Sequence, residues 1–282
     1  MTDQNNHCAA QTGALPEEYC LEICSNGVES SLAAEEAGAT RVELCASLYE
    51  GGTSPSFGVI KCCREVLRHT RLNVMIRPRG GDFLCSEHDL KCMAYEIESA
   101  RDLGADGLVF GCLTADGDID LKALEFLMER AGTTEVTFHR AFDLVRDPKT
   151  ALEQLIEHGV CRLLTSGLRP KAVQGMEMIA ALNAQSAGRI KIMAGSGVSP
   201  DNIMELAVKT GIREFHFSAK VPRPSDMRYR PEEDIMSGSY YIDEYDREVS
   251  SFGMIKAALE VIKGLAGRTH RQTEGKTMLT LN

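Results

Sequence analysis

Residues 28–45 read VESSLAAEEAGATRVELC, and this stretch contains the unit on which the fold is built. Val28 and Leu32 lie at helical spacing, and Gly38 marks the end of that helix. The segment that follows immediately, residues 41–45, is short and rich in β-forming residues. The stretch therefore predicts a helix, a glycine stop and an immediate strand.

The same unit recurs along the chain, because AGATRVEL, LGADGLVF, HGVCRLL and TGIREFH each join a helix end, a glycine and a strand. The expected strands, which are separated by amphipathic segments, are Cys20–Cys24, Arg41–Cys45, Leu72–Ile76, Gly107–Phe110, Glu135–Phe138, Arg162–Leu164, Ile190–Met193 and Glu214–Phe217. Strands that alternate with helices pair in parallel through right-handed crossovers. Eight such units close into a barrel, so we predict an α/β fold, a single-domain TIM-like (β/α)8 barrel. The alternative is an open doubly wound sheet, which would be expected to have one glycine-rich loop at one switch point.

The barrel domain is expected to span residues 19–267, with residues 1–18 as a flexible N-terminal extension and residues 268–282 as a C-terminal tail. The last strand is followed by a long segment, residues 220–251, which holds prolines, four tyrosines and many charges. A connection of this length is either a functional lid or disordered. The tyrosines favour a partly ordered cover over the barrel mouth.

The composition excludes several classes of function. A net charge of −10 argues against a nucleic-acid-binding surface, which needs a basic face. No apolar run approaches the roughly 18 residues of a membrane-spanning helix, and the polar N-terminus lacks the pattern of a secretory signal. Ten cysteines in a chain of 282 residues do not indicate the disulfide framework of a small secreted domain. We therefore expect a cytoplasmic protein with neither nucleic acid nor membrane as a partner.

Ionisable residues gather at the carboxyl ends of the expected strands, where TIM barrels carry their catalytic residues. The first two strands share one pattern of aliphatic, Glu, aliphatic and Cys. If the aliphatic residues face the helices, the alternation of a strand sends the acids and the cysteines inward. Further side chains expected inside by the same parity are Met75, Arg77, Thr137, His139, Glu214, His216 and Ser218. The candidates for acid–base catalysis are Glu22, Glu43, Arg77, His139 and His216.

The stretch VMIRPRGGDF, residues 74–83, places two arginines directly after an apolar strand. Unpaired charge in a closed lumen is costly, so Arg77 is expected to sit opposite Glu43 and Glu22. Arg79, beyond the proline, is expected to face a ligand. An inward Glu–Arg pair can also be a structural network that sets strand register, so both interpretations remain open.

Turns rich in glycine or small residues follow the sixth, seventh and eighth expected strands. In this fold the loops after strands seven and eight often bind phosphate through backbone N–H groups, and arginine adds a fork for an anion. The candidate substrate- or anion-binding residues are Arg79, Arg140, Asp143, Gly195, Ser196, Gly197 and Ser218. The same glycines would also serve merely to permit tight strand-to-helix turns.

Several motifs together closely resemble the CutC family, which is named for copper homeostasis: LEIC, EGGTSPSFG, MIRPRGGDF, GADGLVFGCLTADGDID, VTFHRAFD, LLTSG, AGSGV and EFHFSA. The resemblance runs from about Tyr19 to Ser218 and departs from the family before and after those residues. It implies a cytoplasmic TIM-like barrel, dimeric or of higher order, that binds Cu(I) in copper trafficking or tolerance. The copper ligands proposed in the family match Cys24 and Cys45.

Chemistry allows this copper assignment, because Cu(I) is soft and prefers few thiolate ligands. Barrel stagger places adjacent strands in alternate layers, so whether the two sulfurs meet stays open. The alternative is that Cys24 and Cys45 are small apolar residues lining a pocket, with Met75 as a soft neighbour.

Three hypotheses follow for the function. The first is a Cu(I)-binding protein. The second is a TIM-barrel enzyme that uses Glu and His for acid–base chemistry on a small anionic or phosphorylated substrate. The third is a sensor that binds an anionic metabolite without turnover. Two His and two Glu would also suffice for a metal-dependent hydrolase, although no HxH motif is present.

Overall fold

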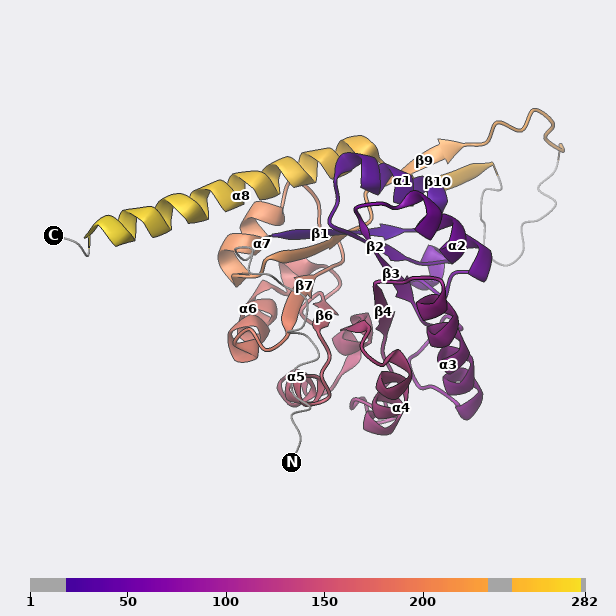
Figure 1. Cartoon of the computed structure of the whole chain (residues 1–282), viewed down its shortest axis with the longest axis horizontal. Helices are drawn as coiled ribbons and strands as arrows, with labels where there is room; N and C mark the ends of the chain where they lie inside the picture. The colour runs from indigo at the N-terminus through magenta and orange to yellow at the C-terminus, as the bar shows by residue number, and fades with distance from the viewer. Residues whose placement is uncertain (1–18, 233–244, 280–282) are drawn as a thin grey trace.

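The computed structural model describes residues 19–232 and 245–279, with side chains described as far as Leu265. At its centre, eight parallel strands in chain order form a closed barrel (Figure 1). These strands are β1 (Cys20–Ser25), β2 (Arg41–Leu44), β3 (Arg71–Met75), β4 (Gly107–Phe110), β5 (Glu135–Phe138), β6 (Arg162–Thr165), β7 (Lys191–Ala194) and β8 (Glu214–Phe217). The predicted TIM-like barrel is confirmed, and the open sheet is excluded because β1 pairs with β8.

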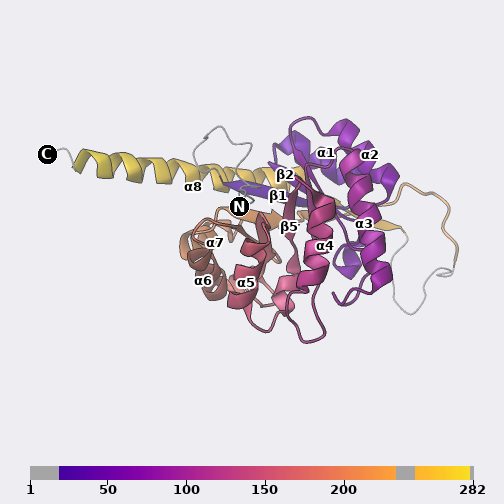
Figure 2. The ribbon, with the colours of Figure 1, turned by 60° about the horizontal axis from the view of Figure 1, so that its bottom comes forward.

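Helices alternate with the strands and surround the barrel (Figures 1 and 2). They are α1 (Val28–Ala37), α2 (Phe57–Val66), α3 (Glu87–Asp102), α4 (Leu121–Ala131), α5 (Pro148–Glu157), α6 (Met176–Ser186), α7 (Ile203–Thr210) and α8 (Phe252–Leu279). The part of the chain that the structure describes also has short 3-10 helices in its loops: η1 (Leu48–Glu50), η2 (Arg140–Leu144) and η3 (Ala172–Gln174). The main hydrophobic core lies between the strands and this helical layer, and Leu21, Ile23 and Val42 are fully buried in it.

Local sequence signals explain where several helices begin and end. Ser86 caps α3 in a capping box, because its Oγ accepts the Asp89 N–H while the Asp89 carboxylate accepts the Ser86 N–H. Asp147 caps α5 directly before a proline, as its sequence predicts. Helix α7 begins at Ile203, after a turn in which the Ser199 N–H donates to Asn202 Oδ1 at 2.9 Å.

The segment after β8 forms a hairpin of its own. Strand β9 (Lys220–Pro224) pairs antiparallel with β10 (Asp246–Ser250), and the hairpin projects from the barrel beside α1 (Figure 1). Asn26 Nδ2 donates to the Glu248 carbonyl at 2.6 Å, which ties the hairpin to the start of α1. Of the four tyrosines expected to cover the mouth, Tyr229 is exposed, and neither it nor the partly buried Tyr245 lines the cavity at the mouth. Tyr240 and Tyr241 lie outside the described residues.

The C-terminal segment of the chain differs from expectation. Residues 1–18, expected to be an extension, lie outside the described residues. Helix α8 continues to Leu279, so most of the segment expected to be a separate tail, residues 268–282, belongs to that helix. Among the described residues, no helix is both long enough and apolar enough to span a bilayer.

Candidate functional site

A cavity of about 520 Å³ opens at the carboxyl ends of the strands. It gathers most of the residues that the strand-end pattern predicted. Those that line it are Cys24, Glu43, Arg77, His139, Arg140, Asp143, Ser196, Gly197, His216 and Ser218. Ionisable side chains from five different strands or strand-end loops therefore meet at one rim, as a TIM-barrel site requires.

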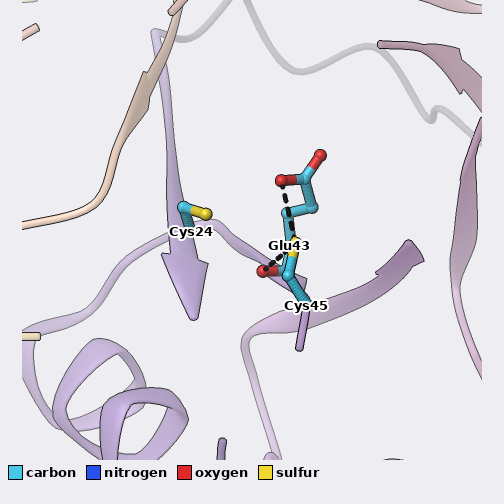
Figure 3. A group of neighbouring side chains, drawn as sticks. All are labelled: Cys24, Glu43 and Cys45. Carbon is cyan, nitrogen blue, oxygen red and sulfur yellow. Dashed lines mark hydrogen bonds between the residues drawn. The ribbon is translucent and has the colours of Figure 1, made fainter. Parts of the chain in front are cut away.

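The register between β1 and β2 brings the two cysteines together. Cys24 is the Cα partner of Glu43 in the ladder, and Cys45 follows Glu43 by two residues and so faces the same side. Cys45 Sγ donates to Glu43 Oε2 at 3.3 Å, as Figure 3 shows. The ligand atoms of Cys24, Glu43 and Cys45 all lie within 4.8 Å of one another. Barrel stagger, left open above, does not keep the two thiols apart.

Beneath the cavity, the barrel lumen holds a buried network of ion pairs. Glu22 pairs with Arg41 and accepts from His216 Nδ1 at 2.8 Å. Arg41 also contacts Glu214 at 2.8 Å, and Glu214 pairs in turn with Arg162. The network continues upward, since His216 Nε2 lies 3.7 Å from Glu43 Oε2. Buried charges paired in this way avoid most of the cost of an isolated ion.

The expectation that Arg77 pairs with Glu22 and Glu43 is wrong. Strand β3 ends at Met75, so Arg77 lies in the following loop and no longer obeys the alternation of the strand. Its guanidinium donates to three backbone carbonyls at the rim, those of Glu50, Gly52 and Gly81, at 2.7 to 2.9 Å. Arg77 therefore lines the cavity while it holds two rim loops together.

Two further anion-site candidates do not line the cavity. Arg79 pairs with Asp82 at 3.0 Å and with Asp89 at 3.3 Å, because the loop carries it toward the start of α3. Gly195 packs between strands, where an added Cβ would come within 2.6 Å of a Leu164 methyl group. Close packing, rather than ligand binding, accounts for the glycine at this position.

The polar groups at the end of β6 and in the loop after it form hydrogen bonds with other residues of the protein. The Asp143 carboxylate accepts from Thr165 Oγ1 at 2.6 Å and from the Ser166 N–H at 3.0 Å. It also pairs with Arg140 Nε at 2.7 Å. Asp143 thus orients Arg140 at the cavity wall. Ser196 Oγ is similarly committed, because it donates to the Pro170 carbonyl at 2.7 Å.

Three inward-facing residues of the lumen were not identified from the sequence: Arg41, Asn73 and Arg162. Each is buried, and Asn73 Nδ2 lies 3.5 Å from Glu22 Oε2. The signal was available, because Arg41 precedes Glu43 by two residues and so shares its parity. Arg41 and Arg162 stand at the amino ends of β2 and β6, away from the cavity, and they balance the lumen acids Glu22 and Glu214.

The network sets unequal protonation of its acids. Burial alone would raise the pKa of Glu22, but Arg41 and His216 outweigh it and lower that pKa to about 2. Burial raises the pKa of Glu43 to about 8, because the nearby Cys24 and Glu22 add to it and His216 only partly opposes it. Burial would lower the pKa of His216, yet its acidic neighbours Glu43 and Glu22, with Cys24, raise it. Near neutral pH the site thus carries an ionised Glu22 carboxylate in the lumen and a protonated Glu43 carboxyl group above it.

The two thiols also differ. Interaction with the neighbouring Cys45 thiol, aided by His216, lowers the pKa of Cys24 well below its usual value despite burial. The same interaction with Cys24, together with burial, raises the pKa of Cys45. Thiolate, rather than thiol, is the form that binds metals. Cys24 is therefore the thiol of this pair that is prepared to act as a ligand.

His139 forms another part of the wall and stays neutral. Burial, with Arg77 nearby, lowers its pKa to about 3. Its Nδ1 accepts the Ala141 N–H at 3.2 Å, which places the proton of the neutral ring on Nε2. Within the described residues Nε2 has no hydrogen-bond partner. A buried donor without a partner is unusual and marks a candidate contact for a ligand or a water.

Comparison with known proteins gives a consistent result. A family model described as the CutC family matches residues 19–221. A CutC family protein of Bacteroides thetaiotaomicron is 52% identical over 87% of this chain and 99% of its own length. A relative from Chromobacterium violaceum with the same name is 46% identical over 86% of this chain and 97% of its own length.

Solved structures also include a protein with the CutC name. A crystal structure of CutC from Streptococcus agalactiae, described as a copper homeostasis protein, is 34% identical with a TM-score of 0.69. The match covers 71% of this chain and 98% of that one. Thiamine phosphate pyrophosphorylase from Pyrococcus furiosus, at 15% identity and a TM-score of 0.55, is similar in fold alone.

Proposed function

The chain belongs to the CutC family, and on that premise we propose that it binds Cu(I) as a cargo ion between Cys24 and Cys45 at the barrel mouth. The family name and the Streptococcus agalactiae relative connect the chain to copper homeostasis. Copper binding and trafficking by this chain are the proposal.

The observation that carries the proposal is the convergence of two thiols on one carboxylate within 4.8 Å (Figure 3). Cu(I) is a soft ion that takes few ligands and prefers thiolates, so two cysteines suffice. Met75 packs with Cys45 and Cys24 in a small cluster inside the mouth, which adds a thioether to the surroundings. Cys24 lines the cavity, so the ion has a route of entry.

The test is an anaerobic titration with Cu(I) against a chromogenic Cu(I) chelator. We expect the Cys24→Ser/Cys45→Ser double variant to lose the high-affinity equivalent held by these residues, with at least a 100-fold fall in affinity. A matched control is Cys62→Ser/Cys92→Ser, which removes two exposed thiols of α2 and α3. Unchanged affinity and stoichiometry in the Cys24/Cys45 variant would remove the copper assignment.

A second candidate function is supported by the size of the cavity. Its volume of about 520 Å³ lies within the range of about 300–1,000 Å³ typical of small-molecule sites. The cationic side chains of Arg140 and Lys220 line it, as does His139. This set suits a small anionic or phosphorylated substrate, on which Glu43 and His216 would move protons.

The enzyme candidate is tested by untargeted mass spectrometry of metabolite extracts incubated with the wild type and with Glu43→Gln. Consumption of one anionic metabolite by the wild type alone supports turnover. Retention of a metabolite without change supports an anion sensor instead. If both proteins leave every pool equal and retain nothing, the cavity has no small-molecule role.

The proposal extends to the cellular location, the domain bounds and the oligomeric state of the protein. We propose that the protein acts in the cytoplasm, with one barrel domain over residues 19–267, as a homodimer or higher homo-oligomer. Cysteines kept reduced in that compartment suit Cu(I) binding. Sedimentation velocity of the purified chain measures the assembly, and a monomer at every concentration would contradict that part.

A further inference from the structure

Three sulfur atoms converge outside the site described above. Cys85 Sγ lies 3.2 Å from Cys112 Sγ and 3.9 Å from Met93 Sδ. The three residues come from different segments: Cys85 from the loop before α3, Met93 from α3 itself, and Cys112 from the loop after β4. The fold therefore assembles the cluster from the rim of the barrel, between the third and fourth strands.

The surroundings of the cluster allow access from one side. Cys112 and Met93 are buried, whereas Cys85 is partly exposed. A void of about 10 Å³ lies against Cys85 and Met93. A void of this size is about one water-sized probe. The volume of the void suits a single small ion or water molecule rather than an organic ligand.

We propose that Cys85, Cys112 and Met93 form a second Cu(I) site, separate from Cys24 and Cys45. The chemical argument rests on the donor set, because thiolates and thioethers are the soft ligands that select Cu(I). A pair of thiols alone would suit a disulfide equally well. The Met93 thioether distinguishes the two, since it contributes nothing to a disulfide but completes a three-sulfur set for the ion.

The two sulfur–sulfur distances from Cys85 are compatible with such a set. Metal–thiolate bonds of about 2.3 Å, spread in one plane, would place three sulfurs about 4 Å apart. The Cys85–Met93 separation of 3.9 Å already matches that spacing. The Cys85–Cys112 separation of 3.2 Å must open by less than 1 Å, which a small side-chain rotation of the partly exposed Cys85 can supply.

The charges around the cluster also fit. When Cu(I) binds, the two thiols release their protons and the copper keeps its oxidation state, so the complex carries one net negative charge. Arg77 and Arg79 line the void beside Cys85 together with Asp82 and Asp89. Arg79 pairs with both of those acids, so Arg77 is the cation that would balance the added charge. Arg77 and Phe83 line the main cavity as well. The two copper sites thus share a wall, formed by Arg77 and Phe83.

The test counts Cu(I) equivalents by anaerobic titration against the same chelator. We expect two equivalents in the wild type, one in Cys24→Ser/Cys45→Ser and one in Cys85→Ser/Cys112→Ser. Met93→Leu, which keeps both thiols and the side-chain volume, should weaken the second equivalent by about tenfold or more. Far-UV circular dichroism of each variant checks that it is folded.

The outcomes separate this site from the first. If the Cys24/Cys45 variant still binds one ion with sulfur ligands by X-ray absorption, the second site stands even when the first has failed. If that variant binds no Cu(I), or if Met93→Leu binds both ions unchanged, the second site is overturned. A mass lower by two hydrogens after exposure to peroxide, with no Cu(I) uptake at the cluster, would identify a disulfide pair instead.

Discussion

At the scale of single residues, His139 links the cavity to pH. Its folded pKa, lowered to about 3, lies below the 6.5 expected in the unfolded chain, so folding keeps the ring neutral. The stability that follows is fully present above pH 6.5 and is lost as the pH falls from 6.5 toward 3, because only the unfolded chain gains the proton. At pH 5 the stability lost through the neutral His139 ring is about 2 kcal/mol.

The prediction is that His139→Gln lessens the fall in unfolding free energy between pH 7.5 and pH 5. Urea denaturation at both pH values measures it, and His69→Gln, at an exposed position, is the control. An equal fall in the wild type and in His139→Gln would show that His139 is protonated in the folded protein.

Single residues also show the limits of prediction from sequence. Strand alternation correctly sent Glu22, Cys24, Glu43 and Cys45 inward, because all four lie within or directly at the end of a strand. It failed for Arg77, which lies beyond the last residue of β3 and follows the geometry of its loop. Alternation is reliable only as far as the ladder extends.

At the scale of elements, the loop after β6 depends on a close approach between two glycines. Gly167 has a φ of 70°, and a Cβ there would lie 2.3 Å from the Gly175 carbonyl oxygen. The positive φ of Gly167 and its close contact with the Gly175 carbonyl both disfavour any side chain at position 167. The loop carries Ser166, which binds Asp143, so its path also sets the position of Arg140.

We predict that Gly167→Ala destabilises the protein by about 2–4 kcal/mol, through strain plus displacement of backbone. The control is Gly188→Ala, which has a similar φ of 78° but open space around the added methyl group. It should cost only about 1 kcal/mol. Chemical denaturation compares them, and equal losses would mean that the contact with Gly175 carries no weight.

Elements with local signals were predicted well, and elements formed by distant pairing were not. The capping box of α3 and the Asp-Pro start of α5 could be identified in a few residues. The β9–β10 hairpin joins segments more than twenty residues apart in sequence, and β9 contains two prolines, which argue against a strand. A two-stranded sheet tolerates them because a proline needs no ladder bond at an outer edge.

At the scale of the whole molecule, the barrel depends on charge balance in its lumen. Arg41 is the common partner of Glu22 and Glu214, which come from β1 and β8, where the barrel closes. Its loss would leave those acids with fewer buried counter-charges. Removal of one member of a buried ion pair typically costs about 3–5 kcal/mol.

We therefore expect Arg41→Met to lower the free energy of unfolding by about 3–5 kcal/mol. Arg146→Met, which breaks an ion pair with Asp118 at the surface, is the control and should change it by less than about 1 kcal/mol. Thermal and urea denaturation measure both. A loss for Arg41→Met as small as that of the control would mean that the network is not required for closure of the barrel.

The central claim concerns the ion at the mouth, and copper X-ray absorption tests it most directly. The sample is the Cys85→Ser/Cys112→Ser variant loaded anaerobically with one equivalent of Cu(I), so that the Cys85–Cys112 pair cannot hold the ion. We predict sulfur neighbours at about 2.3 Å, close to known metal–thiolate bonds. They should disappear when Cys24 and Cys45 are also replaced by serine. A first shell of nitrogen and oxygen alone would contradict the account.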